Sequence, residues 1–271
     1  MSSNHVGGHH RHMRISYAQS LSQRLYSFGL VPLLALIVTI ILIQDFAIAT
    51  PAQGVTPIHI FAAFGATLAR LLLSYLIAVC VALPLALLVT HSPLAERIFL
   101  PVFDIMQSLP VLAFFPVIIV FFVHYGLYNG AAIFVLFITM LWSIVFSLVG
   151  GLHAIPSDIK AAGKIFGLRG FGYMRKILLP ASVPYLITGS LLAFASGWNI
   201  IIVAEVLHTY LPGSGSSSDL FGIGSMLVNA AASGQEHTFV LAIIVLVAAI
   251  ALLNFFVWQK LLRLAERYKF E

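Results

Sequence analysis

Four polar side chains stand inside or at the ends of long apolar runs, where they could bind or guide a charged solute: Arg70, Gln107, Asn199 and Glu205. Hydrocarbon cannot solvate such groups, so they usually face a partner or a water-filled path. We therefore predict that these four line a translocation pathway, in which the positive charge of Arg70 favours an anion. A structural pair of Arg70 and Glu205, or snorkelling to the lipid headgroups, is the alternative.

The sequence carries no recognisable catalytic constellation. It has no G-x-x-x-x-G-K-[ST] phosphate loop, so the chain cannot hydrolyse ATP through that fold. Cys80 is the single cysteine and lies in an apolar run, which excludes a disulfide framework and argues against a Cys-based metal site. Histidines outside the N-terminal tail fall near the ends of apolar runs and not at mid-membrane haem positions. We predict no cofactor, no metal site and no enzymatic activity, with energy supplied by a partner or an ion gradient.

The composition places the chain in a membrane. Only 8% of its 271 residues are charged and 61% are hydrophobic, whereas soluble proteins carry about 25% charged residues. The net charge of +5 is small and scattered, so it gives no nucleic-acid-binding patch. These values exclude an ordinary soluble enzyme, a disordered chain and a nucleic-acid binder. They leave an integral membrane protein in contact with lipid.

Six charge-free apolar runs are long enough to cross a bilayer, which takes about 20 residues in a helix. They cover residues 25–43, 71–89, 105–123, 131–152, 181–204 and 239–257. The alternating pattern of transmembrane β-strands is absent, so we predict an all-α integral membrane protein with six transmembrane helices. Residues 220–232 are apolar but short, and we expect a re-entrant or interfacial segment there.

Prolines and small residues predict how two of these helices bend and pack. Pro110 and Pro116 lie in the third run and Pro101 just before it, which predicts a spanning helix that bends. Gly189, Ala193 and Gly197 recur every four residues in the fifth run and predict a face for close helix contact. That contact could lie within the chain or at a dimer axis.

The basic residues set the orientation. If six helices alternate in direction, every Lys and Arg apart from Arg70 falls on one side. The positive-inside rule makes that side the cytoplasm, so we predict a multi-pass protein of the cell membrane with both termini inside. The predicted parts are a disordered cytoplasmic tail at 1–24, a six-helix transmembrane domain at 25–258 and a cytoplasmic helix end at 259–271. The His-rich tract in the tail could bind metal, but it also fits an unstructured tag-like segment.

Residues 155–180, between the fourth and fifth runs, form the most informative segment. Pro156 and Ser157 can begin a helix, and apolar residues then recur at helical spacing on one face. Gly167, Gly170 and Gly172 predict a break and a chain reversal, followed by a second short helix. This helix-turn-helix could dock on a protein partner or lie on the lipid headgroups.

The segment resembles the cytoplasmic loop of binding-protein-dependent ABC importer permeases, whose pattern is E-A-A-x3-G-x9-I-x-L-P. Gly167, Ile177, Leu179 and Pro180 match at the same spacing. Ala161 stands in place of the glutamate, and Gly163 replaces the second alanine. Three further stretches are similar to the nitrate/sulfonate/taurine importer permeases, namely 67–70, 107–116 and 197–205.

The resemblance implies the architecture of a type I ABC importer permease, in which this loop is the coupling helix. Docking on an ATPase subunit would then involve Ala161, Ala162, Gly163, Gly167 and Leu168. The implied partners are ATPase subunits, a second permease that is a second copy or a related chain, and an external substrate-binding protein. The implied solute is small and of the anionic class of nitrate and sulfonates, taurine included. Bicarbonate and a thiamine-like precursor also stay open.

Two other function classes compete with this interpretation. A secondary transporter driven by an ion gradient would show inverted repeats with interrupted helices, and we see no such symmetry in the sequence. A membrane anchor of a respiratory complex would need histidines in the middle of its spans, and the sequence places none there.

Overall fold

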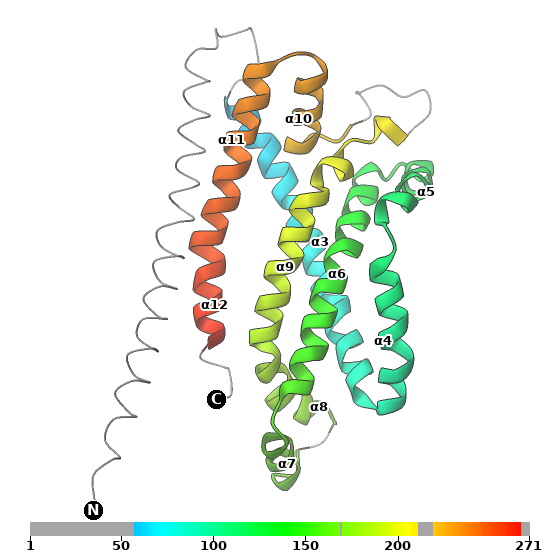
Figure 1. The fold of residues 1–271 in the computed structure, drawn as a ribbon, viewed down its shortest axis with the longest axis vertical. Coiled ribbons are helices and arrows are strands. Elements are labelled where there is room, and N and C mark those ends of the chain that lie inside the picture. The colour runs from blue at the N-terminus through cyan, green and yellow to red at the C-terminus, as the bar shows by residue number, and fades with distance from the viewer. Residues whose placement is uncertain (1–56, 169, 211–218, 267–271) are drawn as a thin grey trace, which may run out of the picture. The chain divides into compact units, whose positions relative to one another are not determined.

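The computed structural model describes residues 57–168, 170–210 and 219–266, and within these ranges it contains helices and no strand. The predicted tail at 1–24, the first predicted span at 25–43 and the end of the chain at 267–271 lie outside the described residues. Figure 1 shows the longest of the described helices running side by side along roughly one direction.

Four of the predicted spans coincide with long apolar helices. The span at 71–89 lies in α3 (Pro57–His91), and the span at 131–152 lies in α6 (Tyr128–Ala154). The span at 181–204 lies in α9 (Leu179–Glu205). The last, at 239–257, is formed by α11 (Glu236–Leu253) and a π-helical turn, η5 (Asn254–Trp258), and continues into α12 (Gln259–Glu266).

The span predicted over 105–123 is not one continuous helix. The chain instead forms α4 (Pro93–Ser108) and α5 (Val111–His124), whose axes differ by 84°. Leu109 is extended between them, with φ −71° and ψ 129°, as expected for a residue that precedes a proline. Pro101 and Pro116 stay inside their helices, so Pro110 alone marks the break. The described part therefore has four membrane-length helices, or five if α4 and α5 form one broken span.

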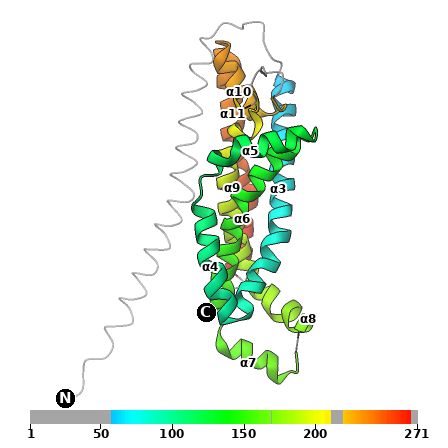
Figure 2. The same cartoon turned by 90° about the vertical axis from the view of Figure 1, so that its right-hand side faces the viewer.

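Helix α6 lies at the centre of the bundle and is buried on most sides, packed against α3 and α9 (Figures 1 and 2). Small residues bring these neighbours close. Ser74, Ala78, Ala82 and Ala86 form a buried stripe along α3. On α9, a Cβ added to Gly189 would lie 3.1 Å from the Cα of Ile144 in α6. The predicted small-residue face of α9 therefore packs within the chain.

Short elements occupy the two ends of the bundle. One end carries α7 (Ser157–Ile165), α8 (Gly170–Tyr173) and the π-helical turn η2 (Met174–Leu178), which leads into α9. Figure 2 shows α7 and α8 projecting below the long helices. The other end carries η3 (His208–Tyr210) and α10 (Ile223–Ala232). Within the short apolar segment at 220–232, residues 223–232 form α10, which is too short to cross a membrane.

Candidate functional site

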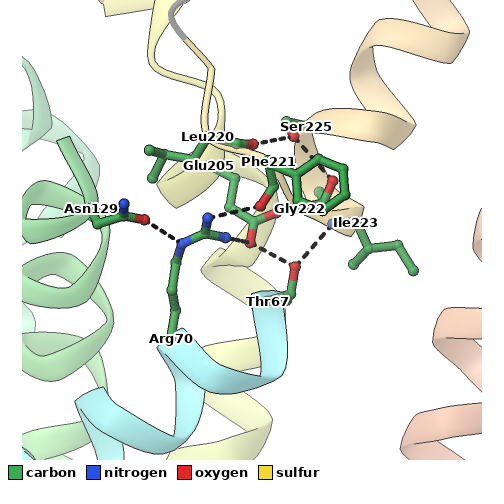
Figure 3. Close-up of polar contacts among 10 residues, drawn as sticks. Thr67, Arg70, Asn129, Glu205, Leu220, Phe221, Gly222, Ile223 and Ser225 are labelled. Atoms are coloured by element: carbon green, nitrogen blue, oxygen red, sulfur yellow. Dashed lines mark hydrogen bonds and ion pairs between the residues drawn. The ribbon is translucent and has the colours of Figure 1, made fainter. Parts of the chain in front are cut away.

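A buried ion pair joins α3 to α9 at the end of the bundle that carries α10. Nη1 of Arg70 lies 2.7 Å from Oε1 of Glu205, the last residue of α9. The side chain of Arg70 is 10% exposed and that of Glu205 is fully buried. The sequence placed both residues near the same membrane face, and the structure brings them into contact across 135 positions of the chain (Figure 3).

Arg70 uses its other nitrogens to hold two further segments. Its Nε donates to Oδ1 of Asn129, near the start of α6, over 2.9 Å. Its Nη2 donates to the backbone carbonyl of Phe221, just before α10, over 2.8 Å. The guanidinium therefore faces protein acceptors on three sides, and its charge is balanced by Glu205. Figure 3 shows these contacts converging from four segments of the chain.

The N-terminus of α10 is capped by side chains of other helices. The first backbone N–H groups of a helix lack partners within it, and the N-cap residue here is Gly222, which has no side chain to supply one. Oγ1 of Thr67 accepts from the N–H of Ile223 over 2.9 Å, and Oε2 of Glu205 accepts from the N–H of Gly224 over 2.8 Å. Thr67 also donates to Oε1 of Glu205 over 2.7 Å. We call Thr67, Arg70, Asn129 and Glu205 the outer polar cluster, after the membrane face that the sequence predicts for Arg70 and Glu205.

This geometry favours the structural alternative for Arg70 and Glu205 over an anion-binding one. Both groups are buried, and the hydrogen bonds described above join them to protein atoms. Gln107 and Asn199, the other two predicted pathway residues, do not join them and are exposed on α4 and α9. Nε2 of Gln107 donates to Oδ1 of Asp104 on the same helix over 3.3 Å.

Sequence reasoning gave no role to Thr67 or Asn129. Thr67 and Arg70 are three residues apart on α3 and so lie on one helix face, which is a signal that the spacing contained. Asn129 lies near the start of α6 and carries no comparable signal. A second polar contact was also missed. Asp219 accepts from the backbone N–H of His208 over 3.0 Å and lies 2.8 Å from Nδ1 of its ring, so it joins η3 to the segment before α10.

The helix-turn-helix expected at 155–180 is present at the opposite end of the bundle. After α7 the chain turns at Gly167 and Gly170, whose φ values of +68° and +52° lie in the left-handed region that favours glycine. The N–H of Leu168 donates to the carbonyl of Gly163 over 3.0 Å and closes the turn. Gly172, the third expected break, lies inside α8.

The five residues predicted to contact an ATPase differ in their exposure. Ala161 and Gly167 are exposed, and Ala162 and Leu168 are half-buried. Gly163 is buried, because it faces Tyr173 and Ile177 of the following helical turns. The most exposed large apolar side chains of the described residues lie next to these positions: Ile165 is 83% exposed and Phe166 is 80% exposed. Gly163 therefore belongs to the internal packing of the helix-turn-helix.

Comparison with known proteins adds to this geometry. Residues 78–263 match the family described as binding-protein-dependent transport system inner membrane component. The chain belongs to this family. The matched residues run from α3 through the helix-turn-helix to α12, so they include most of the described bundle.

Curated relatives in this family are permease proteins. The nitrate import permease protein NrtB of Leptolyngbya laminosa is 33% identical over 185 residues, which cover 68% of this chain and 62% of that protein. The bicarbonate transport system permease protein CmpB of Synechococcus elongatus is 29% identical over 192 residues, 71% of this chain and 65% of that protein. The glycine betaine/proline betaine transport system permease protein ProW of Escherichia coli is 27% identical over 66% of this chain and 49% of its own length. The chain thus spans less than two thirds of each.

Proposed function

We propose that the chain is the permease subunit of an ATP-binding-cassette importer and forms the path for a small anion such as nitrate or bicarbonate. The observation that carries this proposal is the family match, which includes both the long apolar helices and the helix-turn-helix between α6 and α9. The names of the cyanobacterial relatives support an inorganic anion as the solute.

The helix-turn-helix is the proposed docking point for a separately encoded ATPase. Ile165 and Phe166 at the end of α7 present two large apolar side chains away from the bundle. Such exposed apolar groups next to polar surface mark interaction sites. Three neighbouring residues have small side chains that would let a partner approach the backbone closely: Ala161, Ala162 and Gly167. Leu168 is partly covered and lies beside them. Two such permease units, identical or related, would engage two ATPase subunits, and an external binding protein would deliver the solute.

In this proposal the end of the bundle that bears the helix-turn-helix faces the cytoplasm. The helix-turn-helix and the other segments predicted on its side of the membrane carry every Lys and Arg apart from Arg70, and the positive-inside rule makes that side cytoplasmic. The outer polar cluster then lies at the external face. Counting the apolar run at 25–43 and the broken pair α4–α5 together with the four long helices gives six spans, with both termini in the cytoplasm. Cysteine-labelling of single-site variants at Ser2 and Ser216, in a Cys80→Ser background, tests this orientation. Labelling of both positions from the same side would contradict it.

The proposed pathway runs along the exposed polar residues rather than through Arg70. Gln107 and Asp104 lie on α4 among exposed apolar residues, just before the 84° break. Polar groups at that place need water or a second protein, so the second permease and the solute path are proposed on this side. Asn199 is the corresponding candidate on α9. Arg70 and Glu205 would hold α10 in place at the outer mouth.

Copurification tests the docking step. A tagged permease coexpressed with its candidate ATPase should retain that subunit, and Phe166→Asp should remove it, because a carboxylate would be desolvated at the contact. Ile58→Asp is the matched control, since Ile58 is 78% exposed at the opposite end. Equal retention of the ATPase by both variants would overturn the docking assignment.

Uptake tests the transport step. Proteoliposomes with the permease, the ATPase and the binding protein should accumulate labelled nitrate or bicarbonate only when ATP is enclosed with the ATPase in the vesicle lumen. Gln107→Ala should reduce uptake while ATPase copurification is unchanged. Uptake that persists without the ATPase but follows an ion gradient would contradict the importer assignment.

A further inference from the structure

A cavity of about 380 Å³ lies between α3, α9 and the helix formed by α11, η5 and α12. Its walls include Leu72 and Tyr75 from α3, Ser190 and Phe194 from α9, and Val257 and Trp258 from η5. The cavity is separate from the outer polar cluster and from the helix-turn-helix, whose residues do not line it.

The lining favours an apolar occupant. Its two hydroxyl groups, on Tyr75 and Ser190, form a hydrogen bond with each other over 2.8 Å. The Ser190 hydroxyl also donates to the backbone carbonyl of Leu186 over 2.6 Å. The remaining lining residues are aliphatic or aromatic. A polar ligand would lose its hydration in this cavity and gain few partners, which disfavours it.

The mouth of the cavity lies on helices that cross the membrane. Leu72 is 46% exposed and Val257 is 40% exposed, and both belong to helices long and apolar enough to span a bilayer. Molecules that reach this mouth therefore come from the hydrocarbon layer. An α-helix with its side chains is about 10–12 Å wide, so a helix could lie across the opening but would place only side chains inside a space of about 380 Å³. A single hydrocarbon chain is narrow and flexible enough to enter.

Two basic side chains on α12 lie next to the cavity, toward the end of the bundle that bears the helix-turn-helix. Lys260 and Arg263 are both exposed on α12, and Lys260 adjoins Leu261, which lines the cavity. The Nζ of Lys260 lies 5.9 Å from the ring centroid of Phe256, so the ammonium stays beside the apolar helix surface. Basic side chains at this level attract anionic lipid headgroups.

We propose that this cavity binds one acyl chain of an anionic phospholipid, whose phosphate is held by Lys260 and Arg263. The acyl chain fills the space between α3, α9 and η5, and the headgroup lies beside α12. The site does not depend on which solute the protein carries. Its occupant would stabilise the contact between the last helix and the rest of the bundle.

Photocrosslinking tests the proposal with the full-length protein in nanodiscs. The probes are phosphatidylglycerol and phosphatidylcholine that carry a diazirine in the middle of one acyl chain. We expect phosphatidylglycerol to label peptides that contain residues 186–194 and 253–261 more than other apolar helices. Leu72→Trp should fill the mouth and lower this labelling several-fold. Leu76→Trp is the control, because Leu76 is 58% exposed one turn further along α3 and does not line the cavity.

The headgroup is tested separately. The double variant Lys260→Gln and Arg263→Gln should remove the preference for phosphatidylglycerol over phosphatidylcholine, whereas Arg97→Gln on α4 should keep it. Val257→Trp provides a second blocking variant if Leu72→Trp does not fold, as judged by its size-exclusion profile. Equal labelling of all apolar helices, or labelling that neither tryptophan reduces, would show ordinary surrounding lipid and overturn the site. A preference that survives the double variant would overturn the role of Lys260 and Arg263.

Discussion

The carboxylate of Glu205 accepts a hydrogen bond from the backbone N–H of Gly224 over 2.8 Å, so the last side chain of α9 caps the first turn of α10. The same carboxylate is paired with Arg70 of α3. A negative charge at a helix N-terminus is favourable, because it interacts with the helix dipole and satisfies a free N–H. One buried charge thus fixes two helices at once.

Loss of either charge in this pair should destabilise the protein strongly. Glu205→Gln keeps the shape of the side chain but leaves the buried guanidinium of Arg70 without a counter-charge, and breaking a buried pair costs about 3–5 kcal/mol. Thermal unfolding in detergent should show a marked fall in Tm for Glu205→Gln and for Arg70→Gln. The double variant should lose less than the sum of the two, since the residues are coupled. Simple additivity would mean that the pair contributes little.

Gly222→Ala should also lower the Tm, because an added Cβ would overlap the carboxylate of Glu205. The carboxylate would have to leave its position at the start of α10. Gly65→Ala is the matched control. Its Cβ meets no atom within 4 Å, and alanine is favoured over glycine inside a helix by about 1 kcal/mol. A Gly222→Ala protein as stable as Gly65→Ala would contradict the tight contact.

Gly163→Leu should disturb the helix-turn-helix from inside. A Cβ at this position would lie 2.9 Å from Cε2 of Tyr173 and would also meet Ile177. Limited proteolysis should then cut within residues 155–180 more rapidly than in the wild type, and ATPase copurification should fall. Gly172→Leu, where no atom lies within 4 Å of an added Cβ, provides the comparison. If both variants resist proteolysis equally, Gly163 does not support this packing.

Gly189→Ala should weaken the contact between α9 and α6. Its Cβ would lie 2.8 Å from the Cβ of Ser147 and 3.1 Å from the Cα of Ile144, and the backbone of α6 cannot move aside as a side chain can. Overpacking of this kind costs about 1–3 kcal/mol. Thermal unfolding should separate this variant from Gly150→Ala, whose Cβ meets nothing within 4 Å. Matching Tm values would show that α9 can shift without cost.

Hydropathy predicted the long helices because a segment that crosses lipid must form its backbone hydrogen bonds internally and carry apolar side chains. A long apolar run in the sequence is the mark of such a segment. Hydropathy failed at Pro110. Three prolines occur between residues 101 and 116, and two of them are accommodated within α4 and α5. Which proline breaks the helix depends on how neighbouring helices satisfy the freed backbone groups, and a single sequence does not contain that information.

The candidate sites were predictable to different extents. The turn at Gly167 could be located because glycine spacing reports backbone conformation directly. The inward position of Gly163 could not, because it depends on Tyr173 and Ile177 folding back onto α7. Arg70 and Glu205 were identifiable as a possible pair from their placement at the same membrane face. Their partners Asn129 and Gly224 are joined to them only by the packing of α6 and α10.

Helix α6 connects the two ends of the bundle directly. Its 27 residues form an uninterrupted helix about 40 Å long. Asn129 near its first turn holds Arg70, while its last residue, Ala154, is followed almost at once by α7. The helix-turn-helix and the hydrogen bond between Asn129 and Arg70 thus lie at opposite ends of one continuous helix. Neither end of α6 can tilt without a change in the contacts that α6 makes with α3 and α9.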